Sequence, residues 1–145
     1  MADIYNVAQF FLSRAPMSHK KLQKLCYYAQ AWYLANYDNA LVPNRFEAWI
    51  HGPVSPDLYS VYKNWGWLDI PKKPNNDYAF TPNELDILQK VYQVYGNQSG
   101  DELESSTHCE LPWLNARAGY GPSDYCRVPI SMKDMKKYYG ERIGK

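Results

Sequence analysis

The fold is decided largely by residues 20–35, which read KKLQKLCYYAQAWYLA. Ser18 is a good helix N-cap, and apolar side chains then recur at the spacing of one helical face: Leu22, Leu25, Cys26, Ala29, Trp32 and Tyr33. Few positions in this stretch look hydrophilic, namely Lys20, Lys21, Gln23, Lys24 and Gln30. A helix that is apolar over most of its girth is normally wrapped by other elements. We therefore predict a helix over residues 19–37 at the centre of the domain.

The next informative stretch is residues 46–59, FEAWIHGPVSPDLY. Alternating apolar positions predict a brief strand from Phe46 to Ile50, which Gly52 and Pro53 should end. Ser55 can then cap a new helix with Pro56 at its first position, where a missing amide hydrogen costs nothing. We expect the inner face of this helix to carry Leu58, Val61, Tyr62 and Trp65.

Capping signals predict the other helices. The first begins after Asp3 and ends near Arg14, and another lies between the Thr81 capping box and Gly96. Shorter helical segments follow Ser99 and Pro112, and a last helix runs from Ser131 to about Tyr139. A short strand over residues 78–80 is expected to pair with residues 46–50. The sequence thus predicts one compact, mainly α domain over residues 1–145 with a small two-stranded element.

Three blocks of the sequence resemble a known family. They are KLQKLCYYAQAW at residues 21–32, FEAWIHGPVSPDLY at 46–59 and STHCELPWLNAR at 106–117. In this order they resemble the Panacea domain, also called the SocA-like antitoxin or phage-associated GepA-type domain. The segment beyond Ala118, including the helix from about residue 131, matches no feature of the family. The motif positions that carry the resemblance are Lys21, Leu22, Tyr28, Trp49, Gly52, Pro53, Val54, Tyr59, His108, Pro112 and Trp113.

The resemblance implies a function. Panacea domains are compact, mostly helical modules encoded beside toxin genes in bacteria and phages, and they neutralise a partner toxin protein. One alternative is a protease adaptor, because at least one member delivers its toxin to a cellular protease. The resemblance implies neither a cofactor nor a metal.

Composition narrows the choice of partners. Lys+Arg 16 against Asp+Glu 15 gives a net charge of +1, which does not favour nucleic acid or anionic lipid as a partner. The Met-Ala-Asp start lacks a signal sequence, and the longest apolar run, residues 25–35, is too short to span a bilayer. Three cysteines without CxxC spacing suit a reducing compartment. We therefore expect a cytoplasmic protein that is not in the membrane.

An enzyme is the alternative from another class. A small hydrolase using His51 and His108 is conceivable, and Cys109 and Cys126 are the other residues suited to nucleophilic or metal chemistry. Their spacing matches no catalytic or zinc motif, so we expect no catalytic site and no metal. In the structural interpretation Cys26 packs as a small hydrophobe, while His108 forms a hydrogen bond near a helix end and holds the Pro112–Trp113 segment.

The aromatic content favours a binding protein. Tyr 14, Trp 5 and Phe 4 make up 16% of the chain, more than one core of this size needs, so some should reach the surface. Exposed Tyr and Trp often dominate protein interfaces. We predict that the partner binds at Tyr59, Trp65 and Trp67, which Pro53 and Pro56 would help to pre-organise, and at Tyr27 and Tyr28. Alternatively, Trp65 and Trp67 close the core beneath a turn at Gly66.

Overall fold

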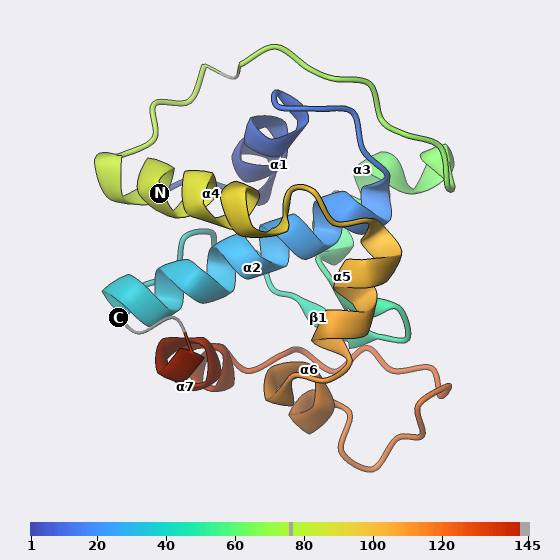
Figure 1. The fold of residues 1–145 in the computed structure, drawn as a ribbon. Helices are drawn as coiled ribbons and strands as arrows, with labels where there is room; N and C mark the ends of the chain where they lie inside the picture. Colours follow the sequence, from blue (N-terminus) through green and yellow to red (C-terminus); the bar gives the residue numbers. More distant parts are fainter. Residues whose placement is uncertain (76, 143–145) are drawn as a thin grey trace.

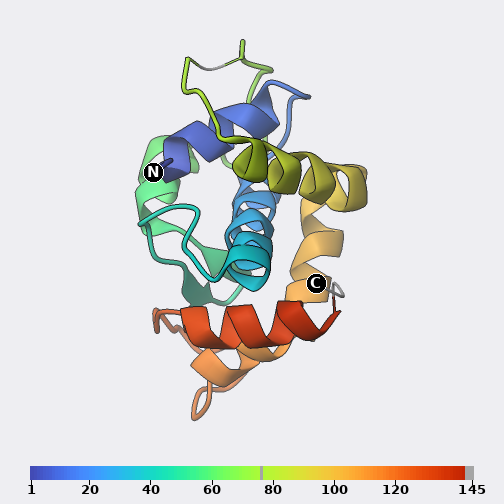
Figure 2. The ribbon, with the colours of Figure 1, turned by 90° about the vertical axis from the view of Figure 1, so that its left-hand side faces the viewer.

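The computed structural model describes residues 1–75 and 77–142, and its centre is the predicted helix, α2 (His19–Tyr37). In Figure 1 the other helices cross α2 above and below, and in the perpendicular view of Figure 2 they surround it. The elements that surround α2 are α1 (Ile4–Leu12), β1 (Glu47–Trp49), β2 (Gly52–Val54), α3 (Pro56–Tyr62), the 3₁₀ helix η1 (Lys63–Trp65), α4 (Pro82–Tyr95), α5 (Gly100–Thr107), α6 (Leu111–Ala116) and α7 (Met132–Arg142). The prediction of a mainly α domain with a small two-stranded sheet is confirmed.

The burial of α2 exceeds the prediction. Gln23, Lys24 and Gln30, which look hydrophilic in the sequence, are only 2%, 1% and 2% exposed. Both glutamines hold neighbouring loops through their amide groups. Gln23 accepts a hydrogen bond from Ser55 N and donates one to Ser55 O, and Gln30 Oε1 accepts from the backbone amides of Leu41 and Val42. Their expected exposure was wrong because elements pack around α2 on all sides.

The two-stranded sheet is a tight hairpin. β1 pairs antiparallel with β2, with Trp49 opposite Gly52, so only Ile50 and His51 lie in the turn. The first strand ends before Gly52 and Pro53, and these two residues begin the second strand, which was not predicted. The other edge of β1 is covered by residues 128–130, through hydrogen bonds from Ala48 N to Val128 O and from Ile130 N to Phe46 O.

Residues 78–80 do not pair with β1, so that prediction was wrong. Tyr78 and Phe80 pack against each other with ring centroids 4.9 Å apart, and Phe80 lies 6.2 Å from Phe10 of α1. Both edges of β1 are already occupied. The hairpin turn places β2 on one edge, and the loop after α6 places residues 128–130 on the other. The arch that leads from η1 to α4 instead passes over α1 (Figure 1).

Most helix boundaries follow their caps. Asp3, Ser18, Ser55, Thr81 and Ser99 all cap the helices that they were predicted to start. Ser131 Oγ likewise accepts a hydrogen bond from Asp134 N at the start of α7, which continues past Tyr139 to Arg142.

The predicted inner face of α3 was only half right. Leu58 is buried and Tyr62 packs on the core, whereas Val61 is 52% and Trp65 37% exposed. The reason is that α3 ends at Tyr62 and the chain tightens into η1, which turns the last position of the expected stripe outward.

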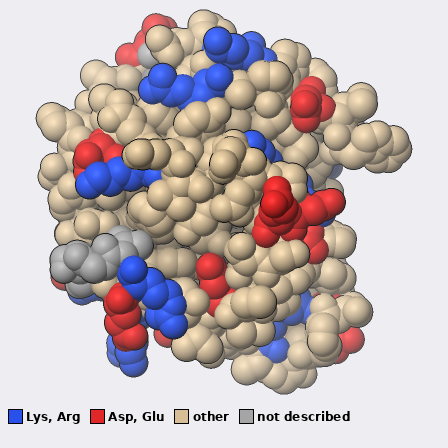
Figure 3. Space-filling view, viewed as in Figure 1, with Lys and Arg blue, Asp and Glu red and all other residues tan. Residues whose placement is uncertain are grey.

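Charged side chains are dispersed over the face of the molecule seen in Figure 3. On the face in Figure 3, small groups of basic and acidic residues alternate between larger uncharged areas. Among the described residues, no helix combines the length and the apolar character needed to cross a membrane.

Candidate partner-binding surface

The hairpin that presents the family motif depends on a glycine. Gly52 has φ +105°, a conformation that side-chain-bearing residues rarely adopt. A Cβ built there would lie 2.6 Å from Lys24 Cε and 3.0 Å from Thr107 Oγ1. Gly52 is thus required twice, by the backbone turn and by the close approach of the buried lysine of α2.

Lys24 belongs to a polar cluster between α2, the hairpin turn and α5. The pKa of Lys24 is lowered to about 7, chiefly by burial and to a smaller extent by nearby Lys20, while Glu104 opposes the shift. Glu104 Oε1 lies 2.7 Å from Lys20 Nζ, and its Oε2 lies 3.2 Å from His51 Nδ1. Although burial opposes ionisation, hydrogen bonds from Lys20 and His51 hold the pKa of Glu104 below its ordinary value. The cluster therefore contains more potential cations than carboxylates.

The structure brings together the two histidines of the hydrolase hypothesis. His108 Nε2 is 4.0 Å from the same Glu104 oxygen that contacts His51. The pocket that includes His51 is otherwise lined by Trp49, Ile50, Tyr125 and Cys126, and Cys126 is 2% exposed. Histidine and carboxylate thus meet, but that pocket offers no accessible hydroxyl or thiolate nucleophile from Ser, Thr or Cys.

The third motif block contacts the hairpin and holds it in place. The His108 ring stacks on Trp113 with centroids 4.1 Å apart, and Trp113 Nε1 donates a hydrogen bond to Trp49 O at 2.9 Å. His108 is also the C-cap residue of α5, and burial lowers its pKa. His108 thus contacts the Pro112–Trp113 segment as interpreted, but through ring stacking on Trp113; the hydrogen bond to the Trp49 carbonyl of the hairpin is donated by Trp113 itself.

Arg117 was not singled out in the sequence, yet it organises the loop beside the hairpin. Its side chain, 4% exposed, donates hydrogen bonds to the carbonyl oxygens of Ala48, Gly121 and Asp124 at 2.8, 2.9 and 2.6 Å. The guanidinium also lies 4.9 Å from the Trp113 ring centroid. The signal available in the sequence was that Arg117 ends the third motif block. A buried Arg needs several hydrogen-bond acceptors near it, and the structure supplies them as backbone carbonyls.

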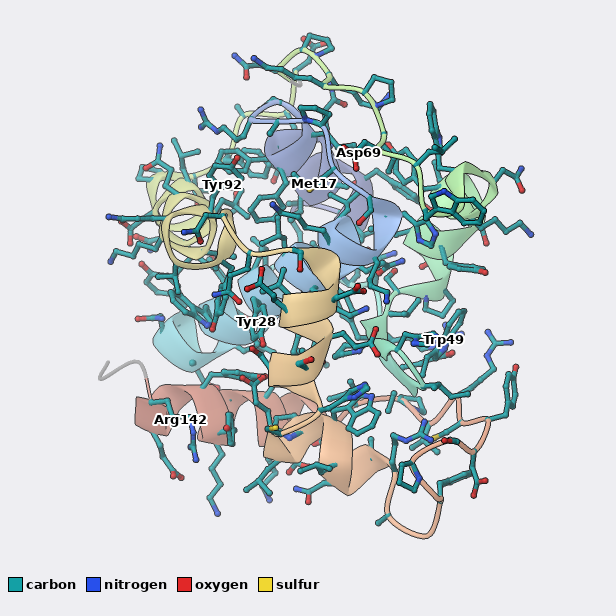
Figure 4. The ribbon with its side chains drawn as sticks, turned by 45° about the vertical axis from the view of Figure 1, so that its right-hand side comes forward. Met17, Tyr28, Trp49, Asp69, Tyr92 and Arg142 are labelled. Carbon is teal, nitrogen blue, oxygen red and sulfur yellow. The ribbon has the colours of Figure 1, made fainter. Side chains whose placement is uncertain are left out.

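Tyr27 and Tyr28 do not lie on the surface. Both are 0% exposed, so the prediction that they form part of a surface patch was wrong. Tyr28 stacks on Tyr95 of α4 with centroids 4.0 Å apart, and its hydroxyl donates to Glu110 at 3.1 Å. Figure 4 shows Tyr28 inside the helical shell and Trp49 at its edge. The reason is that helices cover both flanks of α2.

Tyr59, Trp65 and Trp67 form what we call the aromatic shelf. Trp67 is 90% exposed and Trp65 37%, while Tyr59 is partly buried. The Tyr59 ring rests 4.9 Å from that of Trp49, which joins the shelf to the hairpin. Val61 and Leu68, close by in the sequence, are also exposed, by 52% and 61%. Trp67 does not close the core, contrary to the alternative in the sequence analysis.

The described residues contain no cluster of side chains suited to bind a metal ion. Over residues 1–75 and 77–142, no three His, Cys, Asp or Glu side chains are grouped so that they could hold an ion. Cys26 is 1% exposed and packs in the core as expected, and Cys109 is exposed.

Comparison with known proteins assigns the family. Residues 22–114 match the family model described as antitoxin SocA-like, Panacea domain. The chain is 38% identical over 128 residues to a protein named Antitoxin SocA from Caulobacter vibrioides (strain NA1000 / CB15N), covering 77% of this chain and 68% of that protein. No solved structure matches the chain. The protein described here belongs to the SocA-like antitoxin, Panacea domain family.

Proposed function

We propose that this protein is an antitoxin that binds and neutralises a partner toxin protein in the cytoplasm. The observation that carries the proposal is the 38% identity to Antitoxin SocA, together with a family match over residues 22–114, which covers most of each of the three motif blocks. The proposed action is binding rather than catalysis. Three free cysteines are compatible with a reducing compartment.

The aromatic shelf is the proposed contact surface. Trp67 and Leu68 are consecutive in the chain and expose 90% and 61% of their surface, and contiguous exposed apolar groups that include Trp mark interaction sites. Pro56 begins α3 and restricts the backbone below the shelf, which reduces the ordering cost of binding. Tyr59 and Trp65 would complete the contact.

Two other functions are weighed against this one. A protease adaptor would use the same binding chemistry, and the toxin would then be degraded rather than occluded. A hydrolase would rest on the His51–Glu104 contact of 3.2 Å, but the same glutamate is paired with Lys20, which is typical of a structural ion pair. Binding is therefore the function that the surface supports best.

The test is rescue of growth from the toxin encoded next to this gene. The double variant Tyr59→Ala with Trp67→Ala should bind that toxin about 100-fold more weakly, because two aromatic anchors are truncated, and should fail to rescue growth. Circular dichroism checks the fold, because Trp67 is highly exposed but Tyr59 is partly buried and packs against Trp49 and His19. Toxin half-life in cells separates occlusion from delivery to a protease.

A matched control keeps the test specific. Tyr5→Ala with Met132→Ala also removes two large exposed side chains, 46% and 54% exposed, from elsewhere on the surface. This control should rescue growth at parental strength. Parental binding by the shelf variant would refute the choice of surface, and failure of the parent to rescue growth would refute the antitoxin assignment.

A further inference from the structure

A second feature lies next to the aromatic shelf, on the other side of Trp49. Trp49, Ile50 and His51 of the hairpin, with Tyr125 and Cys126 of the loop after α6, line a pocket of about 150 Å³. Apolar cavities of about this volume accommodate a benzene ring. Cys126 is buried, and Tyr125, 74% exposed, forms an outer wall. The pocket is therefore large enough for one aromatic or branched aliphatic side chain.

The surface beside the pocket has a surplus of positive charge. Arg45, Glu47 and Trp49 occupy alternate positions along the β1 segment and so share one face. The Glu47 carboxylate, 4% exposed, accepts hydrogen bonds from Arg45 Nε at 2.8 Å, Arg127 Nε at 3.1 Å and Trp49 Nε1 at 2.8 Å. One carboxylate thus balances two guanidinium groups, which leaves one positive charge.

The ionisation of Glu47 is secured by these contacts. Burial opposes it, but the hydrogen bonds from Trp49, Arg127 and Arg45 hold the pKa of Glu47 below its ordinary value. The carboxylate therefore stays charged near neutral pH and keeps both arginines on this face. The arrangement is pre-organised before any partner arrives.

Both arginines keep donors for a partner. Their side chains are 56% and 49% exposed, and both use Nε for Glu47; Arg127 also forms a side-chain hydrogen bond with Tyr125. Within the described residues, neither guanidinium has an ion pair with a second carboxylate. The Nη groups of Arg45 are thus available for the two-pronged binding of a carboxylate that guanidinium geometry favours. Arg127 lies 5.4 Å from the Trp49 ring centroid, so this charge sits directly over one wall of the pocket.

We propose that the pocket and the Arg45–Arg127 pair bind an acidic segment of the partner protein. One apolar side chain enters the pocket between Trp49 and Tyr125, and a neighbouring Asp or Glu binds the guanidinium groups. This inference deepens the proposed function and rests on it for the identity of the partner as a toxin. The site adjoins the aromatic shelf through the Trp49–Tyr59 contact, so a single partner segment can engage both.

The experiment uses two short peptides as probes of the full chain. N-acetyl-Asp-Phe-Glu-amide is compared with N-acetyl-Lys-Phe-Lys-amide by following the Trp49 indole N–H signal in NMR spectra. The acidic peptide should shift this signal in a saturable way and bind about tenfold more tightly than the basic one. Tyr125→Ala, which removes the exposed wall of the pocket, should weaken both peptides.

Charge variants must not leave Glu47 buried without partners. The triple variant Arg45→Gln, Arg127→Gln and Glu47→Gln removes the cations and the buried carboxylate together, and it should bind the two peptides equally. The control variant Lys133→Gln with Arg142→Gln removes two cations of α7 and should keep the tenfold preference.

Several results would overturn this inference. Equal binding of both peptides to the parent refutes the charge argument, and a shift of the Trp65 or Trp67 indole instead of Trp49 refutes the pocket. A Trp49 shift that depends on protein concentration without peptide would identify a second copy of this chain as the occupant. Failed growth rescue with an intact peptide preference would refute the proposed function but leave the site standing.

Discussion

Glu104 and Glu110 lie six residues apart, yet the protein shifts their pKa values in opposite directions. Glu104 lies among Lys20, His51 and the buried Lys24, and hydrogen bonds from cations hold its pKa low despite burial. Around Glu110 the partners are hydroxyls, with Tyr139 Oη 2.6 Å and Tyr28 Oη 3.1 Å from Oε1. Burial raises the pKa of Glu110, and the two tyrosines only partly offset it.

The difference identifies two kinds of contact that hold the helices on α2. The Glu104 cluster joins α2 to α5 and the hairpin through charge, whereas the Glu110 cluster joins α2 to α7 through tyrosines: the Tyr139 hydroxyl also lies 3.1 Å from that of Tyr27. The charged cluster lies beneath the family motif around Gly52. The tyrosine cluster anchors α7, which lies outside the family match. Salt should therefore act mainly on the first cluster.

The largest effect is expected at Lys24. Because its pKa falls from 10.5 to about 7 on folding, the unfolded chain binds more protons between these two values, and stability rises with pH across that window. Between pH 7 and 9 the gain from this group is about 2 kcal/mol. Lys24→Met should raise the free energy of unfolding at pH 7 by about 2–4 kcal/mol and flatten the rise.

Urea denaturation at pH 7, 8 and 9 measures this effect. The range stops short of pH 10 because Tyr27, Tyr28 and Tyr139, whose pKa values are raised, lose stability contributions above it. Lys20 and Glu104 change the pKa of Lys24 electrostatically, and Lys24 in turn lowers the pKa values of His19 and His108. Lys137→Met, at an exposed position of α7, is the control. An unchanged pH slope in Lys24→Met would mean that Lys24 is charged in the folded protein.

The second prediction separates the two carboxylates directly. Glu104→Gln removes the carboxylate that acts on Lys24 and one of the two carboxylates paired with Lys20, the other being Asp101 at 2.9 Å, and should cost about 2 kcal/mol at pH 7. Glu110→Gln keeps both an acceptor and a donor for the tyrosine hydroxyls and should cost less than about 1 kcal/mol. Thermal or urea denaturation with the exposed Glu141→Gln as control decides between them. Equal losses would show that both clusters depend on charge to the same extent.

Lowering the pH should change the stability contributions of Glu104 and Glu110 in opposite directions. Glu104 has a lowered pKa, so its contribution is present above its ordinary pKa and is lost as pH falls through the folded value. Glu110 has a raised pKa, so its contribution is present in acid and is lost as pH rises through the folded value.

The sequence predicted interactions between residues close together in the chain better than interactions between distant residues. Caps such as Ser18 and the Thr81–Glu84 box act within four residues, and they located the helices correctly. The pairing of β1 could not be predicted, because it depends on the unusual backbone at Gly52 and on residues 128–130, about 80 positions away.

The candidate site shows the same limit. The aromatic content predicted exposed anchors, and Trp67 is one, but nothing local distinguishes it from Tyr28, which is fully buried. The burial of Lys24 was likewise invisible, because a lysine is hydrophilic in any sequence and only the packing of α5 and the hairpin encloses it. The pocket beside Trp49 could not be predicted from the motif blocks, because one of its walls is Tyr125, which lies beyond the family match.

A smaller effect than at Lys24 or Glu104 is expected at Tyr139 in the tyrosine cluster. Tyr139→Phe removes the hydroxyl that donates to Glu110 at 2.6 Å but keeps the ring packed against Tyr27 and Tyr28, so the loss should be about 1 kcal/mol. This hydroxyl lowers the pKa of Glu110, so its removal should raise that pKa further. An NMR titration of the Glu110 carboxyl measures the shift, with the exposed Tyr5→Phe as control. A Glu110 pKa that stays the same in Tyr139→Phe would mean that burial alone sets it, and that α7 is held by packing rather than by its hydroxyl contact.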